Sequence, residues 1–309
     1  GVSLQECFTQ RQIHIHLKLN NKESNDMKLP IGILIGYKKH TNLIEEFKKA
    51  KELKLSSCQL CIWDVSMFED DAYADGLKEA MKSTGFSVSA IWAGWSGPKE
   101  WNFTMGPTTI GLVPAAYRCE RMKELIRASD FAEKVGVKRI ITHVGFIPEN
   151  PDHPDFVGTV SALRFVISYM KGKGQYFLFE TGQETPVTML RTIQAIGLDN
   201  IGINFDTANL ILYGKANTLD ALDVFGQYVM ETHIKDGHYP TDGLSLGKEV
   251  PAGEGKANLP AVIKKLSALG FGGTYTIERE ISGEEQIRDI IRARDLLLQL
   301  MENKKTIRA

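Results

Sequence analysis

The sequence predicts an α/β protein in which eight strand–helix units close into a (β/α)8 barrel. From Pro30 onward, short runs rich in Ile and Val alternate with helix-like stretches, and eight such runs occur. The runs are continuously apolar, as expected of parallel strands that are covered on both faces. The chain has 309 residues, enough for a barrel of roughly 250 residues. An open doubly wound sheet is the alternative, but the first run lacks the G-x-G-x-x-G spacing of a dinucleotide-binding turn.

Local signals place each element. The predicted strands are residues 31–37, 58–64, 87–92, 139–144, 176–180, 201–206, 229–235 and 274–278. Asn42 and Glu45 have the spacing of a capping box at a helix start, and Gly136 is placed to end a long helix that begins near Ala115. The expected buried faces of three helices are Cys119, Met122, Leu125, Ile126 and Ser129; Val262, Ile263, Leu266 and Leu269; and Ile287, Ile290, Ile291 and Leu298.

Residues 1–29 differ from the rest and are predicted to form a short N-terminal extension, followed by the barrel over residues 30–309. Apolar and polar residues alternate from Ile13 to Leu19, which indicates one strand. An unpaired strand could join a second copy of the chain, so a homo-oligomer stays open. His14 and His16 would share one face of this strand and could form a metal-binding pair. The favoured interpretation is that they lie on the solvated face of an edge strand.

Composition excludes several classes of protein. A net charge of −1 argues against a nucleic-acid partner, and no apolar run approaches the ~20 residues of a membrane span. The four cysteines are too few for a disulfide scaffold, and Cys58 and Cys61 would point to opposite faces of a strand. Unpaired thiols and a cytoplasmic location are therefore expected. No leader pattern is visible, but the chain begins with Gly, so a removed leader stays open.

Four acidic or imidazole residues end successive predicted strands: Glu180, Asp206, His233 and Glu278. The spacing is 26 residues from Glu180 to Asp206 and 27 from Asp206 to His233, about one strand–helix unit. The carboxyl ends of barrel strands converge on one face, and that face carries the chemistry. Three carboxylates and one imidazole form a hard ligand set for a divalent metal. Taken singly, each could instead cap a helix or pair with a basic residue, but crowded like charges need a counter-ion.

The last step, from His233 to Glu278, contains a Gly-rich and Pro-rich excursion over residues 238–258. An insertion at this place would overhang the active face and could act as a lid.

The chain resembles the xylose isomerase-like TIM-barrel superfamily, which includes sugar phosphate isomerases and epimerases, inosose dehydratases and endonuclease IV. The resemblance covers roughly residues 30–300. It rests on Phe-Glu-Thr (179–181), Asn-Phe-Asp-Thr-Ala-Asn (204–209), His-Ile-Lys-Asp (233–236), Gly-Glu-Gly (253–255) and Ile-Glu-Arg-Glu (277–280). It implies that the same four residues bind Mn²⁺, Mg²⁺ or Zn²⁺, and that Glu180 and Glu278 act as the catalytic acid/base pair.

The expected activity is metal-dependent isomerisation or epimerisation of a small carbohydrate, through proton abstraction next to a carbonyl and an enediolate. An inosose dehydratase-like lyase and a non-catalytic sugar-binding barrel are the alternatives. Asn209 stands where epimerases and endonuclease IV carry His, which argues against a nuclease and leaves the substrate open. Pro186 stands where some epimerases carry a carboxylate.

The predicted substrate-binding residues are His143, Lys235, Trp63, Trp92 and Asn209. His143, Trp63 and Trp92 end predicted strands, and apolar ring faces pack against sugar C–H groups. Lys235 shares a strand face with His233 and could bind substrate or neutralise the carboxylates. The alternative for the tryptophans is a side chain that fills the barrel mouth, and for His143 it is a histidine that hydrogen-bonds a neighbouring residue. Trp95 and Trp101 are left unassigned.

Overall fold

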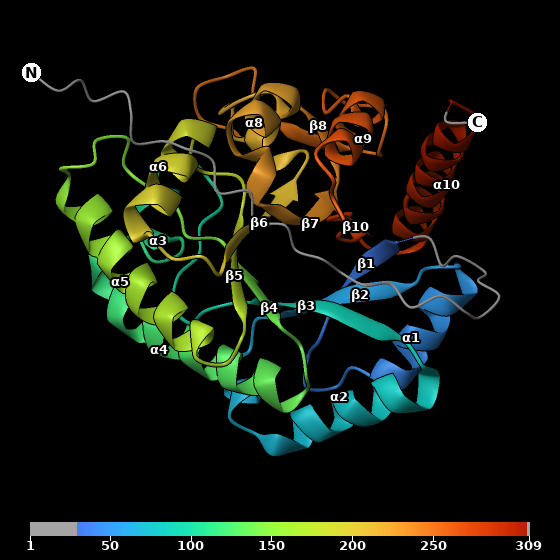
Figure 1. The fold of residues 1–309 in the computed structure, drawn as a ribbon, viewed down its shortest axis with the longest axis horizontal. Helices are drawn as coiled ribbons and strands as arrows, with labels where there is room; N and C mark the ends of the chain where they lie inside the picture. Colours follow the sequence, from blue (N-terminus) through green and yellow to red (C-terminus); the bar gives the residue numbers. More distant parts are fainter. Residues whose placement is uncertain (1–29, 308–309) are drawn as a thin grey trace, which may run out of the picture.

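Eight parallel strands close into a barrel in the order β1-β10-β7-β6-β5-β4-β3-β2, in a computed structural model that describes residues 30–307 (Figure 1). The barrel strands are β1 (Ile31–Gly36), β2 (Ser57–Ile62), β3 (Ser87–Ala93), β4 (Arg139–Thr142), β5 (Tyr176–Glu180), β6 (Ile201–Asp206), β7 (Val229–Ile234) and β10 (Tyr275–Ile277). The predicted (β/α)8 fold is confirmed, and every predicted strand end lies within two residues of the observed one. The predicted extension over residues 1–29, with His14 and His16, lies outside the described residues.

Helices surround the strands (Figure 1). They are α1 (Leu43–Glu52), α2 (Asp71–Thr84), α3 (Gly106–Thr109), α4 (Ala115–Lys134), α5 (Pro154–Lys171), α6 (Pro186–Ile196), α7 (Asn209–Leu212), α8 (Thr218–Phe225), α9 (Leu259–Ala268) and α10 (Glu284–Ile307), with the short 3-10 turns η1 (Val65–Phe68) and η2 (Gly226–Tyr228). In α1 the Asn42 side chain accepts a hydrogen bond from the Glu45 backbone, which confirms the predicted cap. Leu43, Phe47 and Ala50 of α1 are buried at helical spacing.

The predicted buried face of α4 is partly wrong. Cys119 is exposed, and Met122 and Ile126 are only half-buried. Arg121 and Glu124 are buried instead, because their side chains bind the backbone of the loop between β3 and α4. A prediction based on hydrophobicity alone cannot recognise a charged side chain whose partners are main-chain groups.

The predicted buried faces of α9 and α10 are each wrong at one residue. Ile287 is 51% exposed and Leu269 is 47% exposed. Leu269 lies at the C-cap of α9, and Ile287 lies in the first turn of α10, so both lie at helix ends. The remaining apolar residues predicted to lie inward on α9 and α10 are buried or half-buried.

The excursion after β7 forms an antiparallel hairpin of β8 (Asp236–His238) and β9 (Lys248–Val250). Asp236 anchors its base. One carboxylate oxygen accepts hydrogen bonds from the backbone N–H groups of Gly237 and Ala257, each at 2.9 Å, and the other accepts one from Gly253 at 3.0 Å. The predicted insertion is therefore an ordered structure that is tied to the barrel.

The cysteines in the described residues are free. Cys58 is buried, whereas Cys61 on the same strand lines a cavity at the barrel mouth. No helix within residues 30–307 combines the length and apolar composition that crossing a bilayer requires.

Candidate metal centre and substrate cavity

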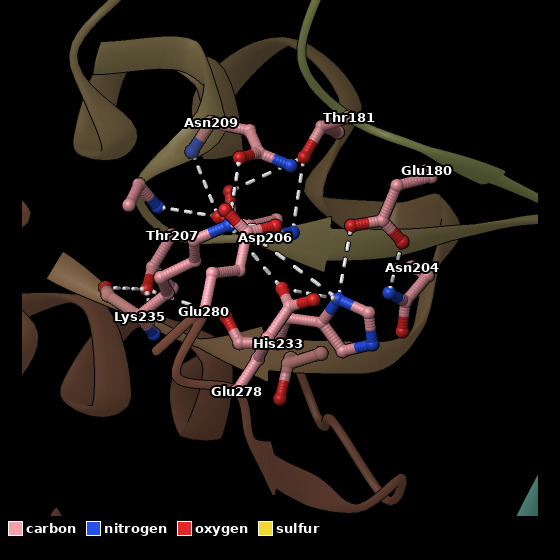
Figure 2. A network of polar contacts seen from close by, with 12 residues as sticks. Glu180, Thr181, Asn204, Asp206, Thr207, Asn209, His233, Lys235, Glu278 and Glu280 are labelled. Atoms are coloured by element: carbon pink, nitrogen blue, oxygen red, sulfur yellow. Dashed lines mark hydrogen bonds and ion pairs between the residues drawn. The ribbon is translucent and has the colours of Figure 1, made fainter. Parts of the chain in front are cut away.

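Four side chains meet at the carboxyl ends of the barrel strands (Figure 2). Glu180 ends β5, Asp206 ends β6, His233 lies near the end of β7, and Glu278 directly follows β10. One potential ligand atom from each residue lies within 4.8 Å of all the others. The four strands are successive neighbours in the barrel. Barrel closure therefore gathers three carboxylates and one imidazole into one cluster.

A chain of amides fixes the orientation of the His233 ring. Glu180 Oε2 accepts a hydrogen bond from Asn204 Nδ2. Asn204 Oδ1 accepts one from Gln59 Nε2 at 3.0 Å, and Gln59 Oε1 lies 2.7 Å from His233 Nε2. Because a carboxylate only accepts, the direction of the chain requires Nε2 of His233 to carry the proton. His233 Nδ1 then faces Glu180 Oε1 at 3.0 Å and Glu278 Oε2 at 3.1 Å.

The cluster contains buried polar atoms without hydrogen-bond partners. They are Nδ1 of His233 and Oδ2 of Asp206. The other carboxylate oxygen of Asp206 is held at 2.7 Å by the backbone N–H groups of Ala208 and Asn209. The two unpartnered atoms thus point at the same small space as the Glu180 and Glu278 oxygens. The hard donors and these unpartnered atoms fit a divalent cation such as Mn²⁺, Mg²⁺ or Zn²⁺.

Lys235 supplies positive charge beside the cluster. Its buried ammonium lies 3.4 Å from Glu278 Oε2 and 3.7 Å from Asp206 Oδ2. It also lies 3.1 Å from Glu280 Oε1 and 3.2 Å from the Asn209 side-chain oxygen. Lys235 therefore contacts three carboxylates and one amide. These contacts support the interpretation that Lys235 neutralises negative charge in the cluster.

These charges shift the pKa values of the cluster in opposite directions. Burial alone would raise the pKa of Glu278, but Lys235 and His233 outweigh it and hold that pKa well below the usual range. Burial raises the pKa of Asp206 well above its ordinary value. Burial disfavours charge on His233, yet Glu180 and Glu278 raise its pKa well above that of a free imidazole. The cluster therefore holds an excess of negative charge that takes up protons when no cation is present.

A cavity of about 410 Å³ opens beside the cluster. Its lining residues are Leu34, Cys61, Trp63, Trp92, Trp101, His143, Glu180, Asn209, Leu212, Tyr213, Leu246, Glu278 and Glu280. Four of the five residues expected to bind substrate are therefore in the wall, namely His143, Trp63, Trp92 and Asn209. Lys235 is not in the wall, but its ammonium contacts Glu278 and Asn209, which are.

His143 presents a neutral imidazole to the cavity. Burial lowers its pKa to about 4, so the ring is uncharged near neutral pH. Its Nδ1 is buried without a hydrogen-bond partner. The ring packs against both Trp92 and Trp101, with centroid distances of 5.7 Å and 5.2 Å. A neutral, unpartnered ring nitrogen in an aromatic wall is suited to a hydrogen bond with an uncharged hydroxyl group.

The sequence analysis missed several residues of the site. Gln59 and Asn204 lie inside strands and hold the His233 ring, and Tyr213 and Leu246 complete the cavity wall. The sequence did mark Gln59 and Asn204 as unusual, because each is a polar residue within an apolar strand, β2 or β6. Tyr213 and Leu246 lie after α7 and in the hairpin insertion, where no sequence periodicity indicates direction.

Fold and site together define a (β/α)8 barrel with a candidate metal centre at the carboxyl ends of four neighbouring strands. A family model described as the xylose isomerase-like TIM barrel matches residues 47–299. The chain belongs to this family, as the motifs of its second half predict.

Similar proteins span a range of activities. The chain is 32% identical to a xylose isomerase domain protein from Planctomyces limnophilus, with a TM-score of 0.82 over 89% of this chain and 98% of that one. It is 17% identical to 3-keto-D-glucoside 4-epimerase from E. coli, with a TM-score of 0.66 over 88% of this chain and 100% of that one. An uncharacterized protein of Methanocaldococcus jannaschii is 28% identical over 120 residues, which is 38% of this chain and 37% of that protein.

A xylose isomerase-like TIM barrel protein from Mycobacterium smegmatis, solved in complex with magnesium, is 17% identical, with a TM-score of 0.66 over 88% of this chain and 96% of that one. A probable 3-DHS dehydratase from Bacillus anthracis is 15% identical, with a TM-score of 0.60 over 87% of this chain and 99% of that one. The fold is thus shared by an epimerase and by a probable dehydratase.

Proposed function

We propose that the protein is a divalent-metal-dependent isomerase or epimerase that acts on a small carbohydrate. The observation that carries the proposal is the convergence of Glu180 and Glu278 on His233 Nδ1, a buried ring nitrogen without a hydrogen-bond partner. Glu180, Asp206, His233 and Glu278 would hold the cation. When bound, it would supply Lewis-acid stabilisation of the negative charge that develops on substrate oxygens.

The two glutamates are suited to move a proton. Both line the cavity, and they come from β5 and from the end of β10, with β6 and β7 between them. Two carboxylates that approach a sugar from different strands can remove a proton from one side of a carbon and return it at the other. Proton removal next to a carbonyl gives an enediolate, and return to a different carbon or face gives the isomer or the epimer.

The surrounding residues have separate roles in this proposal. Lys235 keeps Glu278 ionised, as a base must be before it accepts a proton. The neutral His143 and the side chain of Asn209 would orient sugar hydroxyls. Trp63 and Trp92 would exclude water from the reacting carbons, and the β8–β9 hairpin, through Leu246, would cover the substrate.

The test is exchange of substrate hydrogen with solvent. Purified protein is incubated in D₂O with Mn²⁺ and with ketoses, aldoses or inositol derivatives, and deuterium incorporation is followed by NMR. Glu180→Gln and Glu278→Gln should each lower exchange at least 100-fold, the lower limit of a general acid–base contribution of about 10²–10⁴-fold. Glu284→Gln is the matched control, since its side chain is 94% exposed.

Full exchange by either site variant would refute the acid/base assignment, provided that circular dichroism shows both to be folded. The dehydratase alternative predicts a new conjugated-carbonyl absorbance together with water loss. A non-catalytic sugar-binding barrel predicts binding without any exchange. The same samples therefore separate the three functions.

A further inference from the structure

All four tryptophans of the chain pack against one another, and Trp63, Trp92 and Trp101 line the cavity. Trp63 follows β2, Trp92 is in β3, and Trp95 and Trp101 are in the loop after β3. The Trp63 ring centroid lies 4.9 Å from Trp92, 5.2 Å from Trp95 and 6.3 Å from Trp101. Trp92 and Trp95 are buried, whereas Trp101 is 38% exposed. The aromatic wall therefore extends from the interior of the barrel mouth to the surface.

The aromatic wall is held firmly. Gly94 packs so tightly that an added Cβ would come within 2.5 Å of the Trp63 ring. Arg121 reaches up from α4, and its guanidinium lies 5.3 Å from the Trp95 ring centre. It donates hydrogen bonds to the carbonyl oxygens of Pro98 at 2.9 Å and of Thr109 at 2.7 Å. Because these side chains are already fixed, a flat ligand can bind without the entropic cost of ordering the wall.

Half of the remaining lining residues are apolar. Leu34, Leu212, Tyr213 and Leu246 face the cavity together with the tryptophans, whereas the carboxylates of Glu180, Glu278 and Glu280 are also part of the lining. A volume of about 410 Å³ lies within the roughly 300–1,000 Å³ of pockets that take drug-sized ligands. The cavity thus suits a ligand with one polar end and an extended, flat apolar part.

The charges of the cavity disfavour phosphate. No lysine or arginine is among its lining residues in the described part of the chain, while three glutamates are. Lys235 is buried and contacts Asp206, Glu278 and Glu280. The ammonium of Lys99 lies 5.1 Å from the centre of the Trp63 ring, but Lys99 is not in the lining. A phosphate ester in this cavity would meet carboxylates without a compensating cation from the wall.

We propose that the cavity binds an uncharged glycoside, that is, a sugar ring at the carboxylate cluster joined to a second ring that stacks along Trp63 and Trp101. The second ring is another sugar or an aromatic aglycone, since both present a flat apolar face to indole. The orientation of the first ring rests on the proposed function, whereas the two-ring ligand rests on the aromatic wall and on the charges of the lining. The ligand class follows from two features together: a wall that continues to the exposed Trp101, and a lining without cations.

The test is a binding comparison between matched ligands that cannot react. Phenyl and methyl β-glycosides of glucose, galactose and mannose, disaccharides of the same sugars, and their 6-phosphates are titrated into the protein by calorimetry. The preferred sugar should bind about tenfold more tightly as the phenyl glycoside or the disaccharide than as the methyl glycoside. The 6-phosphates should bind more weakly than the uncharged sugars.

Variants locate the second ring. Trp101→Ala should bring the affinity for the phenyl glycoside down to that for the methyl glycoside and leave the latter unchanged. Phe165→Ala is the control, because Phe165 is 59% exposed on α5, away from the cavity. Equal binding of phenyl and methyl glycosides, tighter binding of the phosphates, or no binding of any glycoside would overturn the proposal.

This outcome is independent of turnover. Tighter binding of two-ring ligands, without proton exchange on any substrate, would refute the proposed function but support the proposed ligand class. Proton exchange on free ketoses, with no increase in affinity from a second ring, would support the proposed function and refute the ligand class.

Discussion

Gln59 is the residue whose replacement tests the architecture of the candidate metal centre most directly. It lies on β2 and reaches His233 on β7, and these strands are not neighbours in the barrel order. The contact therefore crosses the barrel interior. Gln59→Leu keeps the approximate volume, removes the acceptor for His233 Nε2, and removes the donor to Asn204. Both partners are essentially fully buried, so each would be left without a hydrogen bond in the interior.

The magnitude follows from what the lost hydrogen bonds do. Partners that orient a ligating imidazole typically contribute 10–100-fold in metal affinity, which corresponds to about 1.4–2.8 kcal/mol. Two buried groups without partners also cost stability, about 1–3 kcal/mol each. We therefore expect Gln59→Leu to weaken Mn²⁺ binding by 10–100-fold in calorimetric titrations and to lower the free energy of unfolding in urea by roughly 2–6 kcal/mol.

The control separates affinity from general loss of stability. Gln175 is also buried and exchanges two hydrogen bonds with Ser129, at 2.5 and 2.9 Å, but it precedes β5 at the end of the barrel away from the cluster. Gln175→Leu should lower stability by a similar amount and leave Mn²⁺ affinity unchanged. If Gln59→Leu binds Mn²⁺ as tightly as the unaltered protein, the amide chain does not orient the ligand and the reasoning fails.

Three further outcomes are expected. Burial raises the pKa of Glu184 from 4.5 to about 8. Between these pH values the folded chain retains a proton that the unfolded chain releases. The free energy of unfolding should therefore fall between about pH 4.5 and pH 8 by up to about 1.4 kcal/mol per pH unit. In urea titrations Glu184→Gln should remove this fall and exceed the unaltered protein in stability at pH 8.5; parallel pH curves for the two would contradict it. Arg121→Met should cost roughly 2–4 kcal/mol and speed hydrogen exchange over residues 96–113, and unchanged protection there would show that the guanidinium does not hold the loop. Asn209→Asp adds a negative charge beside Lys235 and should tighten Mn²⁺ binding while weakening sugar binding, as two calorimetric titrations would show; unaltered sugar affinity would exclude Asn209 from the substrate site.

The barrel and the convergence of the four candidate metal ligands were predictable because both depend on local sequence. Each strand is a short apolar run, and each of the four cluster residues ends such a run, so the topology of the fold alone brings them together. Gln59 was not predictable in its role, because its partner is 174 positions away and on a strand that β2 does not pair with. Only the three-dimensional register of the barrel decides which interior side chains meet.

The error at α4 has a different origin. Periodicity assigns apolar residues to the buried face, and Cys119 was placed there on that ground. Arg121 is 1% exposed because its stem and guanidinium fill the space beneath a long loop, and its hydrogen bonds go to carbonyl oxygens that no sequence pattern marks. The same limit applies to Leu246, whose place in the cavity wall depends on the path of an inserted hairpin.

The partners of Arg121 have a consequence for how this barrel can diversify. Every hydrogen bond that its guanidinium donates to the β3–α4 loop goes to a main-chain oxygen, those of Ser96, Pro98, Thr109 and Gly111. Every residue type has such an oxygen, so substitutions along the loop leave the anchor intact. Relatives could therefore exchange Trp101 for other side chains and acquire new ligand preferences, while the support beneath the loop stays the same.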